Sequence, residues 1–198
     1  METTQHVLQN PWTFYYYQKP KNPNSDQDYS KCIQKIAKIS TVEEFWAVYS
    51  HVVRPEKLRP IIQLQFFRND SRAMWEDEEN KSGGAFFLSV PKTHGNDQWE
   101  KILLGLIGDQ LNKDFIGAVI GLKPDCMRLY IWNQTADINL CQQLAGELFK
   151  ILELPYKTKI IYTPHSKFLT TDGSGKLITK TTYQFEADGP VVCQSGGK

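Results

Sequence analysis

The sequence predicts an α+β fold, built on a curved, mainly antiparallel sheet of about eight strands. Short segments rich in β-branched and aromatic residues occur in runs along the chain, and three segments with helical apolar periodicity lie between them. Strands in runs with interspersed helices are typical of an antiparallel sheet that helices cover on one side. We therefore expect three helices on the convex face and a slot on the concave face.

The elements of the first third of the chain are predicted from local composition. Aromatic residues dominate 12–18 and predict a strand, and Pro, Asn, Ser and Asp in 19–28 predict a loop. The isoleucines of 33–39 fit a strand and a helix equally badly, so periodicity leaves that choice open. A capping box at 41–44 begins a helix that should end before Pro55.

The remaining two thirds alternate between strands and helices around a long polar stretch. Alternating or continuous apolar runs predict the strands, and apolar residues at helical spacing predict the helices. We predict strands over 61–67, 85–90, 115–122, 128–132, 159–162 and 181–185, and helices over 98–111 and 138–152.

Length and composition indicate one domain over 1–198, with an ordered part over about 6–187 and flexible tails over 1–5 and 188–198. Apolar residues make up 40% of the chain, which is enough for a sizeable core. The formal net charge is only +1, whereas a protein that coats nucleic acid through bulk charge is far more basic. Any RNA binding must therefore occur at a local site.

The cysteines indicate a reducing compartment. They show no metal-ligand spacing and resemble free thiols. The N-terminus lacks a signal pattern, and no apolar run reaches the roughly 18–20 residues that span a bilayer. We therefore expect a soluble, cytoplasmic monomer with no membrane segment. The four cysteines are Cys32, Cys126, Cys141 and Cys193.

Enzyme motifs are absent from the sequence. It contains no GxSxG, P-loop, GxGxxG or HExxH pattern, and its four histidines are widely separated. The acidic run Glu76–Glu79 could hold a divalent metal in a nucleotide hydrolase, but a run of adjacent acids usually marks a solvated loop. We expect no enzyme activity, no metal and no cofactor, and keep the hydrolase as an alternative.

Trp75 is the unusual residue of the polar stretch, because Glu76 follows it directly. A large ring in a polar loop either plugs the core from outside or stacks on a ligand. A cationic purine is attracted to aromatic faces, and its N1–H and amino group require a carboxylate acceptor. Trp75 and Glu76 offer both groups in adjacent positions.

The same segment resembles the cap-binding loop of the initiation factor 4E family, through Met74-Trp75-Glu76-Asp77-Glu78 followed by Asn80-Lys81 and Gly83-Gly84. Further matches follow the family's order over roughly residues 6–166. They comprise the start at 6–10, the first helix at 41–51, the second helix at 106–108 and the strand pair at 117–119 and 131–132. The Tyr-rich 13–17 and the segment 49–55 resemble the divergent 4E homologous protein branch.

This resemblance implies a site for a 7-methylguanine base. Tyr29 would stack on one face of the base, where the general initiation factor carries Trp, and Trp75 would stack on the other. Glu76 would accept two hydrogen bonds from the guanine edge, the Trp75 backbone N–H would point at O6, and Trp132 would lie near the N7 methyl. Lys123 and Arg128 align with phosphate-binding positions.

Two departures from the family affect the phosphates. Lys stands at 123 where the family has Arg, and Lys cannot form the planar fork that Arg does. Asp125 falls on a third basic position and would repel phosphate. We therefore expect weaker cap affinity than in the general factor. From the residues alone, Lys123 and Arg128 could also be solvated turn charges.

The resemblance also implies a dorsal patch for a partner helix with a Tyr-x-x-x-x-Leu motif, by helix-in-groove recognition. Without the resemblance, Trp46 would be taken as a core residue of its helix. Glu100 and Val7 replace an apolar residue and a Pro of the general factor, which puts the usual scaffold interaction in doubt. The predicted dorsal patch comprises His6, Val42, Trp46, Glu100, Leu103 and Leu104.

Together these features predict a protein that binds capped mRNA and regulates translation initiation, as a repressor that occupies caps. Two other interpretations stay open besides the hydrolase. The chain could be a general factor that recruits the scaffold to promote translation, or an interaction module with a degenerate, empty pocket.

Overall fold

The computed structural model describes residues 5–20, 29–166, 181–186 and 189–194. Most of the predicted loop at 19–28 and the predicted loop at 170–175 lie outside these residues. No helix in the described part of the chain is long and apolar enough to cross a membrane.

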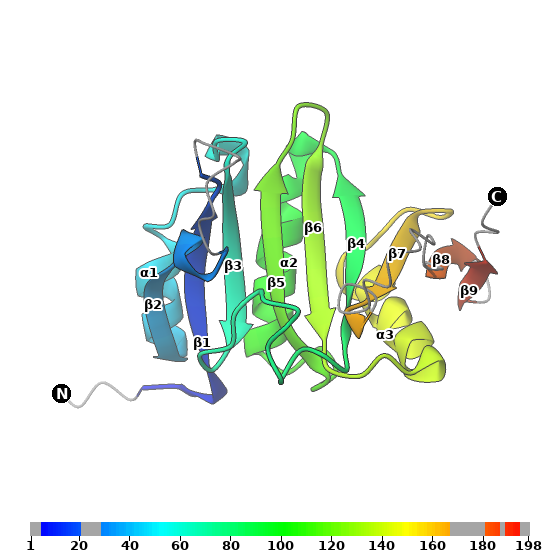
Figure 1. Ribbon diagram of the computed structural model, residues 1–198, viewed down its shortest axis with the longest axis horizontal. Coiled ribbons are helices and arrows are strands. Elements are labelled where there is room, and N and C mark those ends of the chain that lie inside the picture. Colours follow the sequence, from blue (N-terminus) through cyan, green and yellow to red (C-terminus); the bar gives the residue numbers. More distant parts are fainter. Residues whose placement is uncertain (1–4, 21–28, 167–180, 187–188, 195–198) are drawn as a thin grey trace.

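A curved sheet of nine antiparallel strands forms the centre of the molecule (Figure 1). Each neighbouring pair in the sheet is antiparallel. The spatial order is β2-β1-β3-β5-β6-β4-β7-β8-β9, so the ends stay open. The strands are β1 Val7–Gln18, β2 Ile33–Thr41, β3 Ile62–Arg68, β4 Gly84–Val90, β5 Phe115–Leu122, β6 Met127–Asn133, β7 Lys159–Pro164, β8 Thr181–Glu186 and β9 Gly189–Gln194.

Three strand predictions need correction or completion. The region 188–198 was predicted to be a tail, but 189–194 forms β9 and pairs with β8. β1 begins at Val7 rather than at 12, because its pairing with β2 continues past a register shift between Val7 and Trp12. The isoleucine segment that periodicity left undecided is strand β2, which lies at the open edge of the sheet.

Three helices lie on one face of the sheet: α1 Val42–Tyr49, α2 Gly95–Ile107 and α3 Ile138–Ile151. The capping box is present at α1, where the Thr41 hydroxyl accepts from the Glu44 N–H at 3.1 Å. The Glu44 carboxylate accepts in turn from the Ser40 N–H at 2.6 Å. α2 begins three residues before the prediction and ends at Ile107, with Gly108 as its C-cap.

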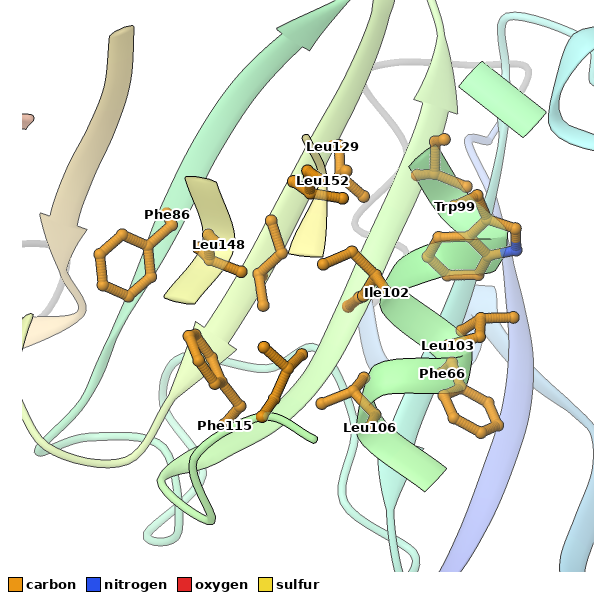
Figure 2. Close-up of a cluster of buried hydrophobic side chains, with 14 of the residues drawn as sticks. Phe66, Phe86, Trp99, Ile102, Leu103, Leu106, Phe115, Leu129, Leu148 and Leu152 are labelled. Carbon is orange, nitrogen blue, oxygen red and sulfur yellow. The ribbon is translucent and has the colours of Figure 1, made fainter. Parts of the chain in front are cut away.

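The larger apolar cluster fills the space between the helices and the sheet (Figure 2). Buried side chains at helical spacing on α2 pack against strand residues and against α3, as the apolar face of 98–111 predicted. The labelled members from α2 are Trp99, Ile102, Leu103 and Leu106, facing Phe66, Phe86, Phe115, Leu129, Leu148 and Leu152.

A second, smaller apolar cluster lies on the opposite face, which none of the three α-helices α1, α2 and α3 covers. We call this face the open face and this group the open-face cluster. The pleat of each strand sends alternate side chains to the two faces, so β3 gives Phe66 to the larger cluster and Phe67 to this one. Its buried members are Tyr15, Ile33, Phe67, Ala73, Met74, Ile116, Val119 and Trp132.

Candidate functional site

The open-face cluster anchors both segments that carry the predicted stacking residues. Ile33 follows the short 3-10 helix Tyr29–Cys32 and is buried in the cluster. Ala73 and Met74 directly precede Trp75 and are buried in the same cluster. The two segments are far apart in the sequence, yet each is fixed to one patch of the sheet immediately beside its aromatic residue.

Both aromatic side chains keep exposed surface. Trp75 is 37% exposed and Tyr29 is 38% exposed, whereas a ring that plugged the core would be nearly covered. Tyr29 rests against Tyr17, with the ring centroids 4.8 Å apart and the planes inclined by 31°. The alternative in which Trp75 plugs the core is therefore wrong.

The charge of Glu76 reaches the Tyr29 hydroxyl. Burial raises the pKa of Tyr29 to about 12, with smaller contributions from Tyr17 and from the Glu76 carboxylate. The Gln65 side chain acts in the opposite direction and lowers that pKa. Glu76 itself is exposed. The Glu76 carboxylate is therefore close enough to the phenol to act on it electrostatically.

Trp132 lies beside the Trp75 loop and is mostly buried. It is 8% exposed, and its ring meets Phe67 edge-on at 5.4 Å between centroids. The His165 ring also packs against Trp132, at 4.2 Å between centroids. Trp132 is thus a wall residue of the open-face cluster, in the same cluster as Met74, and offers little exposed ring surface.

The Trp75 loop is held by a buried amide. Asn80 is fully buried, and its Nδ2 donates to the carbonyls of Arg72 at 3.0 Å and Met74 at 2.6 Å. A salt bridge joins Arg72 to Asp77 at 3.7 Å. The resemblance included Asn80 in the loop motif, but nothing in the sequence indicated that its side chain is buried and holds the loop.

The predicted phosphate-binding residues lie at the β5–β6 turn. Arg128 is exposed on β6, opposite Gly121 on β5. It is four residues from Trp132 on the same strand face, which separates the two by about 13 Å along the strand. Lys123 is half-buried, with its N–H donating to the Cys126 carbonyl at 2.8 Å, and Asp125 is exposed at the tip of the turn.

A cation that the sequence prediction did not include also lies at this turn. The Lys92 ammonium donates to the Pro124 carbonyl at 2.6 Å, from the short 3-10 helix Lys92–His94 that precedes α2. It can stabilise the turn and adds positive charge beside Lys123. Only the fold brings it there, because Lys92 is 31 positions from Lys123 in the sequence.

The predicted dorsal patch is exposed in part, on the helical side of the molecule. Trp46 is 43% exposed and Leu104 is 36% exposed. His6 is joined to the start of α1, with its Nδ1 at 2.7 Å from the carboxylate of Glu43. The hydrogen bond from His6 lowers the pKa of Glu43 to about 2. Val42 is half-buried, and its N–H donates to the His6 carbonyl at 2.9 Å.

Leu103 was predicted as a surface residue of this patch but is fully buried in the larger apolar cluster. Its neighbour Leu104 is the leucine that reaches the surface. Glu100 forms an ion pair with Arg54 at 3.2 Å, and the Arg54 guanidinium lies 4.2 Å from the centre of the Tyr49 ring. An ion pair therefore lies at the position where the family resemblance implied an apolar side chain in the general factor.

Metal-ligating groups do not gather in the described part of the chain. Among those residues no three His, Cys, Asp or Glu side chains are arranged to hold an ion. Members of the acidic run bind cations or hydroxyls of their own loop instead, through Glu78 with Lys81 and Glu79 with Ser71.

Comparison with known proteins gives the family. The family profile described as "Eukaryotic initiation factor 4E" matches residues 7–180. The chain belongs to this family. Membership places it among translation initiation factors rather than enzymes.

Other members of the 4E family align with most of this chain. The rice protein "Eukaryotic translation initiation factor NCBP" is 33% identical over 172 residues, covering 85% of this chain and 75% of its own length. The Caenorhabditis elegans factor 4E-4 is 28% identical over 178 residues, covering 88% and 84%. Human factor 4E is 30% identical over 177 residues, covering 85% and 80%.

Solved structures of 4E proteins share the fold. C. elegans eIF4E-3, in complex with the 4E-binding protein Mextli and a cap analogue, superposes with a TM-score of 0.76 at 23% identity, covering 84% of this chain and 96% of that one. A schistosome eIF4E complexed with m7GpppA and 4E-BP gives 0.74 at 28% identity, covering 88% and 97%.

The convergence of Glu76 and Tyr29 can be tested directly. Replacing Glu76→Gln removes a negative charge that raises the pKa of Tyr29, so we expect that pKa to fall. Tyrosine-ring NMR during an alkaline titration measures it. Glu78→Gln, in the same loop but paired with Lys81, is the matched control. An equal response to both variants would show that Glu76 does not face Tyr29.

Proposed function

We propose that this protein binds the 7-methylguanosine cap of mRNA in a slot on its open face. The observation that carries the proposal is the pair of partly exposed rings, Tyr29 and Trp75, fixed beside one buried cluster with Glu76 close to the phenol. The relatives solved in complex with a cap analogue and with m7GpppA support the same ligand.

In this mechanism the two rings hold the base through its positive charge. Methylation at N7 makes guanine cationic, and each aromatic face attracts a cation by roughly 1–2 kcal/mol in a partly desolvated site. Two such faces separate methylated from unmethylated guanine by about 10- to 1000-fold. Glu76 accepts hydrogen bonds from N1–H and the amino group, each contributing about 1.5–3 kcal/mol as charged bonds.

Trp132 closes the slot at the N7-methyl side as a wall, and the phosphates extend toward the β5–β6 turn. Lys123 and Arg128 neutralise them there, whereas the negative charge of Asp125 repels them.

The cap-binding unit is one domain over 1–198. The protein functions in the cytoplasm as a monomer.

We further infer that the dorsal patch receives a helix with a Tyr-x-x-x-x-Leu motif, and that the protein represses translation by occupying caps. The relatives solved in complex with Mextli and with 4E-BP support a partner of this class. The Arg54–Glu100 ion pair favours the repressor, because an apolar scaffold residue would have to desolvate it. The names of the relatives as initiation factors favour the general role as the second candidate.

Removing the Trp75 ring tests cap binding. We expect Trp75→Ala to abolish retention on a cap-analogue resin, because one cation-binding face is lost, with affinity falling about 10-fold or more. Trp46→Ala, which removes the other exposed tryptophan, should be retained like the wild type. Equal retention of Trp75→Ala would exclude the sandwich, and cleavage of the analogue with Mg²⁺ would favour the hydrolase.

The phosphate side makes a separate prediction. With Lys at 123 and an acid at 125, extending the ligand from mono- to triphosphate should raise affinity less steeply than in the general factor. Asp125→Lys should steepen the dependence, since it replaces repulsion by attraction. Asp125→Asn is the control for charge removal alone. Titrations with 7-methylguanosine mono-, di- and triphosphate measure how affinity rises with phosphate number. A rise in the wild type as steep as that in the general factor would contradict the prediction.

Substitutions at the Arg54–Glu100 ion pair and at Trp46 test whether the protein represses or promotes translation. We expect the wild type to bind a scaffold-derived Tyr-x-x-x-x-Leu peptide weakly in calorimetry, and Glu100→Leu to bind it more tightly because no carboxylate is desolvated. Trp46→Ala should lose binding to any such peptide. Wild-type binding as strong as the general factor's, together with replacement of that factor in growing cells, would show that the protein promotes translation.

A further inference from the structure

Two buried polar side chains lie directly behind the Trp75 loop and have no place in the recognition described so far. Asn80 is 0% exposed and His165, at the end of β7, is 1% exposed. Each keeps one polar atom without a hydrogen-bond partner, the Asn80 Oδ1 and the His165 Nε2. Leaving such atoms unpaired in the interior costs free energy. An apolar pair of similar shape would pack without that cost.

His165 forms hydrogen bonds to the backbone at Asn80 and at Gly83. Its Nδ1 lies 2.8 Å from the Asn80 carbonyl, and its backbone N–H donates to the Gly83 carbonyl at 2.8 Å. Because a carbonyl only accepts, Nδ1 carries the proton. Gly83 has no room for a side chain, since a Cβ would lie 1.9 Å from the Asn133 carbonyl oxygen. The segment after the loop is therefore fixed to β6 and β7.

Asn80 in turn sets the direction of one peptide group. Its Nδ2 donates to the Met74 carbonyl at 2.6 Å, and that carbonyl also accepts from the Asp77 N–H at 3.3 Å. The Met74 carbonyl belongs to the same peptide group as the Trp75 N–H. In a planar trans peptide the C=O and N–H point in opposite directions. A carbonyl held inward by a buried amide therefore turns the Trp75 N–H outward.

We propose that Asn80 and His165 are positioning residues that orient the Met74–Trp75 peptide so that the Trp75 N–H faces O6 of the bound guanine. The inference rests on the proposed function, because it assigns a task within the same slot. Its chain of contacts runs from His165 through the Asn80 backbone and amide to Met74. Neither residue touches the base.

The test compares 7-methylguanosine triphosphate with its 6-thio analogue, which keeps N1–H and the amino group but replaces O6 by sulfur, a weak acceptor. We expect the wild type to prefer the oxygen ligand about 3- to 10-fold, the value of one hydrogen bond. In Asn80→Ala and His165→Leu this preference should approach unity. His165→Asn keeps a donor near the Nδ1 position and should restore it. Preference for methylated over unmethylated guanosine triphosphate should stay within about twofold of the wild type in all three variants, because the stacking rings are unchanged.

The two failures can be distinguished. If the wild type does not prefer methylated guanosine triphosphate, the proposed function is wrong. If it does, and the oxygen-to-sulfur preference is unchanged in Asn80→Ala and His165→Leu, only the positioning role is wrong. Should these variants not fold, the Trp75 amide resonance of the wild type decides. It should move further with the oxygen ligand than with the thio ligand, and equal movement would overturn the proposal.

Discussion

The packing of the open-face cluster is the constraint on which the whole site depends. Phe67 and Trp132 meet edge-on within this cluster, and burying a ring of this size stabilises the fold by about 2–3 kcal/mol. The segments that carry Tyr29 and Trp75 contribute Ile33 and Met74 to the same cluster. Cohesion between distant parts of the chain therefore fixes where the two rings stand. The helices stabilise the sheet from the other side and leave this face to the ligand.

A site of this kind depends on where its aromatic faces and charged groups lie, rather than on the net charge of the protein. The chain carries a formal +1, and the proposed slot offers two aromatic faces and one carboxylate to a ligand whose base is cationic and whose tail is anionic. Such a site recognises the methylated base through the rings. The turn with Lys123 and Asp125 contributes less to the tail than a pair of arginines would, because Lys is a point charge and Asp opposes it.

Much of the fold could be predicted from periodicity and local chemistry. The capping box at Thr41 and the apolar spacing on α2 are local signals, and both were confirmed. The choice between strand and helix stayed open for β2, because an edge strand with lysines between its isoleucines shows neither strand nor helix periodicity clearly. β9 was missed because its pairing with β8 is a tertiary contact that composition does not record.

The site shows the same division between local and tertiary information. The exposure of Trp75 beside Glu76 followed from chemistry and family resemblance. Leu103 and Leu104 are equivalent in composition, and only the rotation of α2 decides which is buried. In the sequence, His165 is only one of four widely separated histidines. Its position behind the Trp75 loop results from β4–β7 pairing, which brings His165 beside Asn80, 85 positions away in the sequence.

Tryptophan fluorescence during titration with 7-methylguanosine triphosphate and with unmethylated guanosine triphosphate tests the central claim most directly. If a cationic base is held between Tyr29 and Trp75, the methylated ligand quenches the emission at concentrations about 10- to 1000-fold lower than the unmethylated one. Equal quenching by both ligands, or none by either, would contradict the account.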